Sequence, residues 1–380
     1  LLIFLLVSLT LIYKYIYIYI YIYMKILFLG FYCVDCECLY GDYNFLRDCG
    51  PYAFFSKYAS PMNKQKCDKL HKGEIQLAHT EYEKYRKHFN FEGGPLVGIK
   101  SLIYNLSLHK NINIKIANKI EEGYDFYYIH SINDNLINDI NDNKLIINNK
   151  IIISHHIDKN NLNKLKNIKY KRWTHSNCNK SDFYLPYPIH KTLYKIYPLI
   201  SINKNKNKIL IFTKKNCKNK NLGKILLKQE EKIKLFFNNN NINCLSLSYF
   251  NKGFRRSELL NYANQSKICL YLSFYDSGGI SLKEITFMGC YAIGFINSKT
   301  NQNINHSFAP SSIIENETGE FINEFSRICD NNSDADINLQ NGCQKVLDIY
   351  NSNKINNFNI AKKARDYLSE DIFLETLFKS

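Results

Sequence analysis

Glycine, proline and arginine are scarce in this chain of 380 residues, which contains 16 Gly, 7 Pro and seven Arg. So little glycine and proline excludes collagen-like and elastic proteins. Acidic residues are also few: 34 Asp and Glu stand against 50 Lys and Arg, which gives a formal net charge of +16. Hydrophobic residues still make up 45% of the chain. The chain can therefore bury real cores, and its length suits two domains of average size.

The excess of positive charge has two explanations. It is consistent with an anionic partner, such as nucleic acid, an acidic membrane surface or an anionic substrate. The chain is also rich in Asn, Ile, Lys, Tyr and Phe, whose codons are AT-rich, so codon composition explains part of the charge. The charge is unevenly distributed, because residues 201–235 alone hold 11 Lys and only two Glu.

Twelve cysteines in a chain of this length do not require an oxidising compartment. Five of them crowd one early segment close to His71: Cys33, Cys36, Cys38, Cys49 and Cys67. A structural zinc site, disulfides formed in a secretory lumen and free thiols all remain open for this cluster, although its spacing matches no standard zinc site. The other seven are scattered, and we expect them to be small buried hydrophobic residues.

Residues 1–23 are almost wholly apolar and end in alternating Tyr and Ile. Their length suits one membrane span, which needs about 20 residues. However, Lys14 near the middle of a span costs about 2.5–3.5 kcal/mol, and Met24 begins a segment that has the pattern of a native start. We expect residues 1–23 to be upstream sequence outside the real protein, with an N-terminal anchor as the alternative.

From Met24 onward, short apolar runs alternate with longer amphipathic ones, which predicts an α/β architecture with parallel sheets. We expect an N-terminal domain over 24–200 with a Cys- and Tyr-rich insertion at 31–91, a C-terminal domain over 201–350 and a C-terminal helix over 351–380. Strands are predicted at Lys25–Leu29, Ile112–Ala117, Phe126–His130, Lys150–Ser154, Ile209–Phe212, Asn243–Ser248, Ile268–Leu272 and Tyr291–Ile296. Helices are predicted at Leu96–Leu108, Gly223–Phe237, Ser257–Ala263, Ile280–Met288, Asn338–Tyr350 and Ile360–Phe378.

The most informative segment is YLSFYDSGGISLKEITFMGCYAIGFI, at 271–296. A predicted strand runs into a loop that holds Asp276 and then Gly278 and Gly279, and a helix follows. Two adjacent glycines let backbone N–H groups approach a ligand, and the helix N-terminus adds partial positive charge, so the pattern favours an anion or a sugar hydroxyl. Glu284 follows on the helix, and its carboxylate can accept hydrogen bonds from vicinal hydroxyls in the same cleft as Asp276. The alternative is an ordinary βαβ unit with a glycine turn and a solvated Glu.

This segment resembles the signature of group-1 (family-4-type) nucleotide-sugar glycosyltransferases of GT-B fold, in which two acidic residues are separated by seven others with glycines among them. Asp276 and Glu284 have that spacing, with Asp at the first position where the family has Glu. The segment 312–321, with Thr-Gly at 318–319, is similar to the family's next segment without its usual Gly-Gly. In the N-terminal half, Gly93 and Gly94, before a predicted helix, resemble the family's glycine-rich loop, which implies a contact with the donor.

The resemblance implies two Rossmann-like domains that face a cleft, with the donor nucleotide on the C-terminal domain and the C-terminal helix packed back toward the N-terminal domain. Glu284 would bind the ribose hydroxyls, and Asp276 would contact the transferred sugar. The backbone amides of Gly278, Gly279 and Ile280 would meet sugar or phosphate oxygens.

The family's diphosphate-binding Arg and Lys would fall on Lys215 and Lys220, with Lys214 and Lys218 as rivals. Fixed cations there would stabilise the charge that the departing nucleoside diphosphate gains. A solvated Lys- and Asn-rich loop explains these lysines equally well.

His130, at the end of a predicted strand, resembles the histidine that approaches the sugar from the N-terminal domain, with His155 or His156 as the alternative. A buried or surface histidine without such a role remains open. We expect no metal and no cofactor, because lysines and a helix dipole would cover the phosphates of the co-substrate.

The prediction is therefore a glycosyltransferase that moves a sugar from a nucleoside-diphosphate sugar to a carbohydrate, lipid or protein acceptor, with retention implied by the resemblance. One alternative is a degenerate relative that binds the nucleotide-sugar without turnover. A basic nucleic-acid-binding protein is another, but Arg, the preferred base reader, is scarce and no nucleic-acid motif is present. We expect the protein in the cytoplasm or on the cytoplasmic face of a membrane, with peripheral association as an option.

Overall fold

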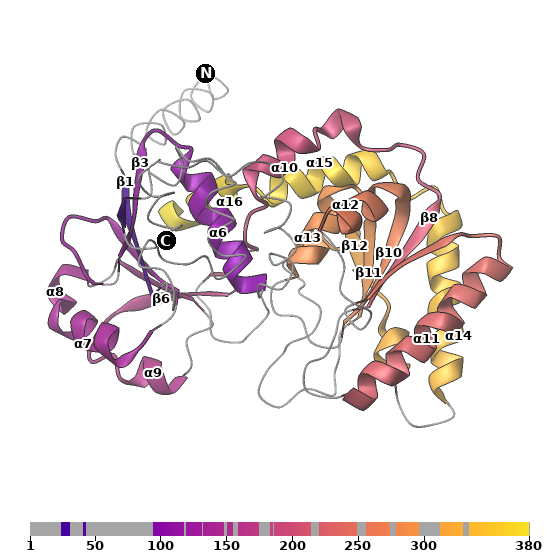
Figure 1. The fold of residues 1–380 in the computed structure, drawn as a ribbon, viewed down its shortest axis with the longest axis horizontal. Helices are drawn as coiled ribbons and strands as arrows, with labels where there is room; N and C mark the ends of the chain where they lie inside the picture. The colour runs from indigo at the N-terminus through magenta and orange to yellow at the C-terminus, as the bar shows by residue number, and fades with distance from the viewer. Residues whose placement is uncertain are drawn as a thin grey trace, which may run out of the picture. The chain divides into compact units, whose positions relative to one another are not determined.

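The fold is taken from a computed structural model (Figure 1), which describes residues 24–30, 41–42, 94–117, 119–130, 132–147, 150–154, 159–174, 183–184, 186–213, 220–248, 256–273, 279–295, 312–329 and 334–379. The segment 1–23, the cysteine cluster with His71 and all but two residues of the predicted insertion at 31–91 lie outside this part of the chain. In the described part, no helix combines the length and apolar character that a membrane crossing requires.

The first sheet has seven strands in the order β2-β3-β1-β4-β5-β6-β7. Their bounds are β1 (Met24–Leu29), β2 (Gly41–Asp42), β3 (Ile112–Ala117), β4 (Phe126–Ile129), β5 (Ile151–Ser154), β6 (Tyr170–Thr174) and β7 (Phe183–Tyr184). Strands β3, β1, β4, β5 and β6 pair in parallel, and the short β2 pairs antiparallel with β3. Numbered along the chain, the five parallel strands have the order 2-1-3-4-5 of a doubly wound sheet.

Three helices between these strands bury apolar residues in one core with the first sheet: α7 (Asp134–Asp142), α8 (Lys144–Ile147) and α9 (Lys159–Asn163). Helix α6 (Gly94–Ser107) precedes β3 in the chain. Helix α7 begins where the side chain of Asn133 accepts a hydrogen bond from the N–H of Leu136 at 2.9 Å, an N-cap of the usual kind. Its buried face packs in one core with residues of β1, β4 and β5. The sequence analysis did not predict α7, α8, α9 or β6.

The second sheet has five strands in the order β12-β11-β10-β8-β9, and all its pairs are parallel. Their bounds are β8 (Lys208–Thr213), β9 (Cys244–Ser248), β10 (Ser266–Leu272), β11 (Tyr291–Gly294) and β12 (Gly319–Phe321). Numbered along the chain, this order is again 2-1-3-4-5. Each half therefore contains five parallel strands in the same order.

Helices cover both faces of the second sheet (Figure 1). They are α10 (Lys191–Ile196), α11 (Lys220–Asn239), α12 (Arg256–Gln265), α13 (Ile280–Phe287), α14 (Asp334–Asn351) and α15 (Asn357–Tyr367), with 3-10 turns η2 (Leu199–Ser201) and η5 (Asn323–Arg327). Helix α16 (Glu370–Lys379) follows α15 in the chain. Leu210 and Phe212 of β8 face one core, which contains residues of α12, α13 and α15. Ile209 and Ile211 face the other, which contains residues of α11 and α14.

Packing divides the described chain into two units. The first contains β1 and the residues from Ile103 to Trp173, and the second contains the start of α6 up to Leu102 and the residues from Thr174 onward. This division falls inside the predicted N-terminal domain, 24–200. The reason is that Ile189, Leu193 and Ile202 are buried in the same core as Leu210 of β8. The domain limits predicted from the sequence stay a prediction, and this packing favours an earlier boundary.

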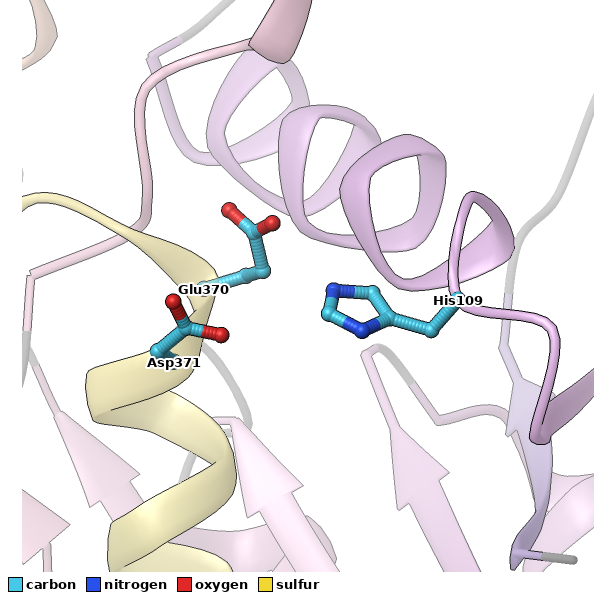
Figure 2. Close-up of side chains that lie close together, drawn as sticks. All are labelled: His109, Glu370 and Asp371. Carbon is cyan, nitrogen blue, oxygen red and sulfur yellow. The ribbon is translucent and has the colours of Figure 1, made fainter. Parts of the chain in front are cut away.

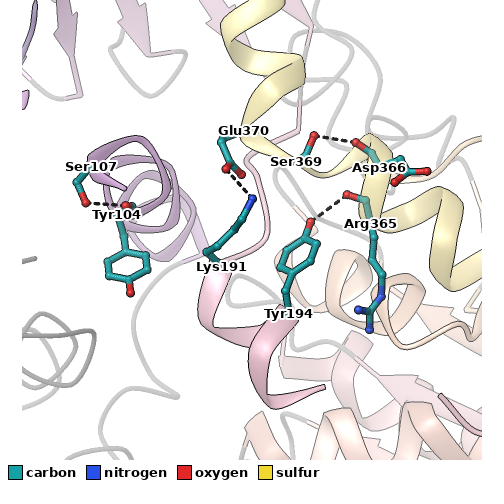
Figure 3. A network of polar contacts seen from close by, with 8 residues as sticks. All are labelled: Tyr104, Ser107, Lys191, Tyr194, Arg365, Asp366, Ser369 and Glu370. Atoms are coloured by element: carbon teal, nitrogen blue, oxygen red, sulfur yellow. Dashed lines mark hydrogen bonds and ion pairs between the residues drawn. The ribbon is translucent and has the colours of Figure 1, made fainter. Parts of the chain in front are cut away.

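The single C-terminal helix predicted at Ile360–Phe378 is wrong, because α15 and α16 are separate. Leu368 ends α15, and its N–H donates to the carbonyl of Ala364. The Ser369 hydroxyl donates to the carbonyl of Asp366 at 2.8 Å (Figure 3). Glu370 and Asp371 then form the acidic first turn of α16 (Figure 2), where the helix dipole favours negative charge.

The predicted fold class is confirmed at the level of the two halves. Both are α/β, each has a doubly wound sheet of five parallel strands, and helices flank the sheets. Predicted strands such as Ile112–Ala117 agree with the observed bounds. The predicted meeting of the two halves at a cleft and the packing of the C-terminal helix toward the N-terminal domain stay predictions.

Candidate functional site

The second sheet has a topological switch point between β8 and β10. From β8 the chain passes to β9 on one side, and from β10 it continues through β11 and β12 on the other. The two strands end in register, with Thr213 of β8 opposite Leu272 of β10. In open α/β sheets, ligands bind outside the carboxyl ends of the strands at such a point. The connections that leave β8 and β10 are therefore the candidate ligand-binding segments.

The connection from β10 leads directly into α13. Gly279 is the N-cap of this helix, has the left-handed conformation with φ 50° and ψ 38°, and makes no side-chain capping bond. Because the first N–H groups of a helix have no acceptor within the helix, they are available to an anion at this end. Ile280 is the first residue of α13. Asp276 and Gly278 lie outside the described residues, so their predicted roles stay predictions.

Glu284 lies on α13 and is only 3% exposed. The helix contacts α12, α15 and β11, and residues 282–290 are all buried. The alternative of a solvated Glu at this position is therefore wrong. The adjacent Lys283 is 1% exposed, and its ammonium donates to the carbonyl of Tyr187 at 3.0 Å. A carboxylate is seldom buried in this way without a specific role in binding or in the fold.

The end of α13 is fixed by a Schellman motif at Gly289. Gly289 has φ 78°, and its N–H donates to the carbonyl of Thr286 at 2.8 Å. The N–H of Cys290 donates to the carbonyl of Ile285 at 3.2 Å, which is the second bond of the motif. The helix that carries Glu284 is thus defined at both ends by a left-handed glycine.

A buried carboxylate on α11 holds the end of β8. The Thr213 hydroxyl donates to Glu230 Oε2 at 2.7 Å, and the Ser246 hydroxyl of β9 donates to Oε1. Lys234 Nζ lies 3.1 Å from Glu230 Oε1. Burial lowers the pKa of Lys234, but its hydrogen bonds with Glu231 and Glu230 raise that pKa above its ordinary value overall. This cluster fixes the strand end from which the predicted diphosphate-binding loop departs.

The sequence analysis missed Glu230, although α11 carries a signal for it. The buried positions of this helix include Leu226, Glu230, Ile233 and Phe237, spaced by four, three and four residues. Glu230 therefore stands at a core position of an amphipathic helix. A charged residue in such a stripe indicates a buried polar partner, here the hydroxyls of two adjacent strands.

The lysines of 201–235 have diverse roles in the described part of the chain. Lys206 is buried and donates to the carbonyls of Ala263 and Met288, while Lys232 pairs with Asp336. Lys220 is the first residue of α11. Lys215, like its rivals Lys214 and Lys218, lies outside the described residues. Part of the local positive charge thus serves the fold, and the predicted phosphate contacts of Lys215 and Lys220 stay predictions.

In the first unit, His130 lies at the corresponding switch point. It directly follows β4, and its N–H donates to the carbonyl of Leu29, the last residue of the neighbouring β1, at 2.9 Å. Gly30, which follows Leu29 in the chain, has φ 78°. The His130 side chain is half-buried. His155 and His156 lie outside the described residues.

Gly94 is the first residue of α6, which agrees with the prediction that the glycine pair precedes a helix. Gly93 lies outside the described residues. A contact of either glycine with a donor stays a prediction.

The Thr-Gly pair of the second family-like segment has a structural role here. The Thr318 hydroxyl accepts a hydrogen bond from the N–H of Ile314 at 2.8 Å and so closes a turn before β12. A Cβ at Gly319 would lie 2.3 Å from the carbonyl oxygen of Ala292 on the adjacent β11. This pair therefore supports strand pairing.

Comparison with known proteins gives little further guidance. No family model matches the chain. No curated protein matches it. Among solved structures, a sucrose-phosphate synthase from Thermosynechococcus elongatus aligns with a TM-score of 0.40 and 10% sequence identity over 94% of this chain and 98% of that chain. A similarity of this size carries no argument about fold or activity.

Proposed function

We propose that the second unit binds a nucleoside-diphosphate sugar at the carboxyl ends of β8 and β10 and that the protein is a glycosyltransferase. One observation carries this proposal: α13, with its left-handed Gly279 and buried Glu284, follows the strand that borders the switch point. The family-like signature in the sequence occupies this same strand, turn and helix. The position favoured by topology and the position favoured by sequence therefore coincide.

Each group at this site has a proposed role. The N-terminal N–H groups of α13, from Gly279 and Ile280 onward, would bind phosphate or sugar oxygens. The carboxylate of Glu284 would accept hydrogen bonds from the vicinal ribose hydroxyls. Asp276 would contact the transferred sugar. Gly278 would leave room for the ligand to approach the backbone.

Charge stabilisation is the main catalytic contribution in this proposal. The bond between sugar and diphosphate breaks, and the departing nucleoside diphosphate gains negative charge. Lys215 and Lys220, on the connection that leaves β8, would meet that charge together with the positive end of α13. In the first unit, His130 is the candidate for a contact with the sugar. We assign no step to a metal, and we expect the activity to persist in the presence of a chelator.

The test is sugar transfer or hydrolysis measured with a panel of UDP- and GDP-sugars. We expect Glu284→Gln to lower activity at least tenfold, because a hydrogen bond to a charged group contributes about 1.5–3 kcal/mol. The matched control is Glu315→Gln, which changes an exposed carboxylate of the same unit and should leave activity unaltered. Equal activity of wild type and Glu284→Gln would contradict the proposed role.

Binding of a nucleotide-sugar without any turnover would favour the degenerate relative. Two features of the sequence point that way: Asp276 stands where the family has Glu, and the usual Gly-Gly before 312–321 is missing. Binding of the donor should still depend on Glu284 in that case.

A further inference from the structure

The hydroxyl of Ser273 is buried at the carboxyl end of β10, and no described residue is its hydrogen-bond partner. Ser273 directly follows the last residue of this strand and is 2% exposed. Among the residues that the structure describes, its Oγ has no hydrogen-bond partner. Buried hydroxyls are almost always hydrogen-bonded, because leaving one unpaired costs free energy. This group therefore requires an explanation.

The alternation of side chains along β10 places Ser273 on the face that α13 covers. Ile268, Leu270 and Leu272 belong to the core on the α11 and α14 side. Cys269 and Tyr271 belong to the opposite core, together with α13 residues. Because successive side chains of a strand point to opposite faces, Ser273 continues the row of Cys269 and Tyr271. Its hydroxyl thus lies on the side of the sheet where α13 packs.

The hydroxyl at the end of the neighbouring strand β8, on the α11 side of the sheet, has a hydrogen-bond partner. Thr213 is buried and donates to the carboxylate of Glu230 on α11. Thr213 is the last residue of β8 and Ser273 directly follows β10. Of these two hydroxyls, only that of Thr213 has a hydrogen-bond partner among the described residues. Glu230 accepts from the Thr213 hydroxyl, whereas no described residue accepts from the Ser273 hydroxyl, which lies at the start of the connection to α13.

We infer that the Ser273 hydroxyl donates a hydrogen bond to a phosphate oxygen of a ligand bound at the N-terminus of α13. This inference rests on the proposed function and adds a side-chain donor to its backbone N–H groups. A phosphate oxygen suits the position because the first N–H groups of a helix have no acceptor within the helix, and a hydroxyl on the same side of the sheet would add a side-chain donor to this anion site. The ligand class is a diphosphate, whether free or part of a nucleotide.

The experiment compares wild type, Ser273→Ala and a control on the same strand. The control is Ser266→Ala: Ser266 begins β10 at the opposite edge of the sheet, is fully buried, and donates from its hydroxyl to the carbonyl of Tyr262 at 2.8 Å. Calorimetry measures binding of UDP, GDP, inorganic pyrophosphate and the two nucleosides. Thermal unfolding is measured without ligand.

We expect Ser273→Ala to weaken binding of pyrophosphate and of the preferred nucleoside diphosphate about tenfold and to leave nucleoside binding unchanged. Without ligand, this variant should melt at the wild-type temperature or above it, because the hydroxyl that it removes has no hydrogen-bond partner in the described part of the chain. Ser266→Ala should melt a few degrees lower and bind all ligands as wild type does.

Unchanged diphosphate binding in Ser273→Ala, while wild type binds and Glu284→Gln does not, would overturn this inference and leave the proposed function intact. A lower melting temperature of ligand-free Ser273→Ala would also overturn it, because the hydroxyl would then serve the fold. Equal weakening of nucleoside and diphosphate would overturn the assignment to phosphate. Failure of wild type to bind any diphosphate would overturn the proposed function and this inference together.

Discussion

Lys206 shows how a single buried residue serves the fold of the second unit. Its ammonium donates to the carbonyl of Ala263 at 2.8 Å and to that of Met288, which ends α13. Positive charge near the carboxyl end of a helix is favourable. Burial nevertheless lowers the pKa of Lys206 to about 8, although the nearby Cys290 raises it slightly.

This lowered pKa predicts a specific pH dependence of stability. Between about pH 8 and pH 10 the unfolded chain holds the Lys206 proton more tightly than the folded chain does, so this group makes the free energy of unfolding rise with pH. The slope is at most about 1.4 kcal/mol per pH unit. Lys206→Met should remove this contribution. Urea unfolding of both proteins at pH 8, 9 and 10 measures the difference, in which other titrating groups cancel.

Identical slopes for wild type and Lys206→Met over this range would contradict the prediction.

The sequence indicated only that the region is rich in lysine, and local composition cannot distinguish a buried Lys206 from a solvated one. The distinction arises from packing, because the two carbonyls that Lys206 binds come from residues far along the chain.

The scattered cysteines behave as small hydrophobic residues where the structure describes them. Cys269, Cys290 and Cys343 are fully buried, as the sequence predicted. Burial raises the pKa of the Cys290 and Cys343 thiols to about 12. Such thiols are largely unreactive at neutral pH. Cys244 and Cys329 are half-buried.

At the scale of elements, α13 depends on the glycine that ends it. A Cβ at Gly289 would lie 2.3 Å from the carbonyl oxygen of Asn357 on α15. The Asn357 side chain in turn donates to the carbonyl of Gly289 at 2.6 Å and to that of Lys267 at 3.1 Å. The close approach of α13 and α15 therefore requires glycine both for its positive φ and for its missing side chain.

Gly289→Ala should therefore lower the free energy of unfolding by more than backbone strain alone would. A matched control is Gly123→Ala, since Gly123 has φ 84° and a Cβ there would meet nothing within 4 Å. We expect about 1 kcal/mol of lost stability for Gly123→Ala and at least about 3 kcal/mol for Gly289→Ala. Chemical denaturation of both variants measures this. Equal losses of stability in the two variants would contradict this prediction, because they would show that the contact with Asn357 rearranges without loss of stability.

Elements with strong local patterns were predictable, and those that depend on distant contacts were not. The apolar runs of β3 and β8 and the periodicity of α11 gave their positions within a few residues. By contrast, α15 and α16 share one continuous helical pattern, and only the capping at Leu368 separates them. Helix α7 had a detectable signal in Asn133 and the apolar positions after it.

At the scale of the whole chain, the two halves repeat one strand order. Each has five parallel strands ordered 2-1-3-4-5, so each has a switch point between its first and third strands. The alternation of short apolar runs with longer amphipathic runs predicted parallel α/β halves. The order of the strands was not predictable in this way, because it depends on which strands pair with one another. The sequence located Glu284 and Gly279 of the candidate site because their signature is local. The sequence did not identify Ser273, Thr213 or Glu230 as candidates. Their burial and hydrogen bonding in the structure did.

The most direct test of the account is hydrogen–deuterium exchange of the whole protein with and without its preferred nucleoside diphosphate. If the ligand binds at the switch point of the second sheet, protection should increase in peptides that cover 271–284 and 212–224, which follow β10 and β8. Peptides from the opposite edge of the sheet, such as 262–268, should be unchanged. Protection confined to other segments, with none at 271–284, would contradict the account.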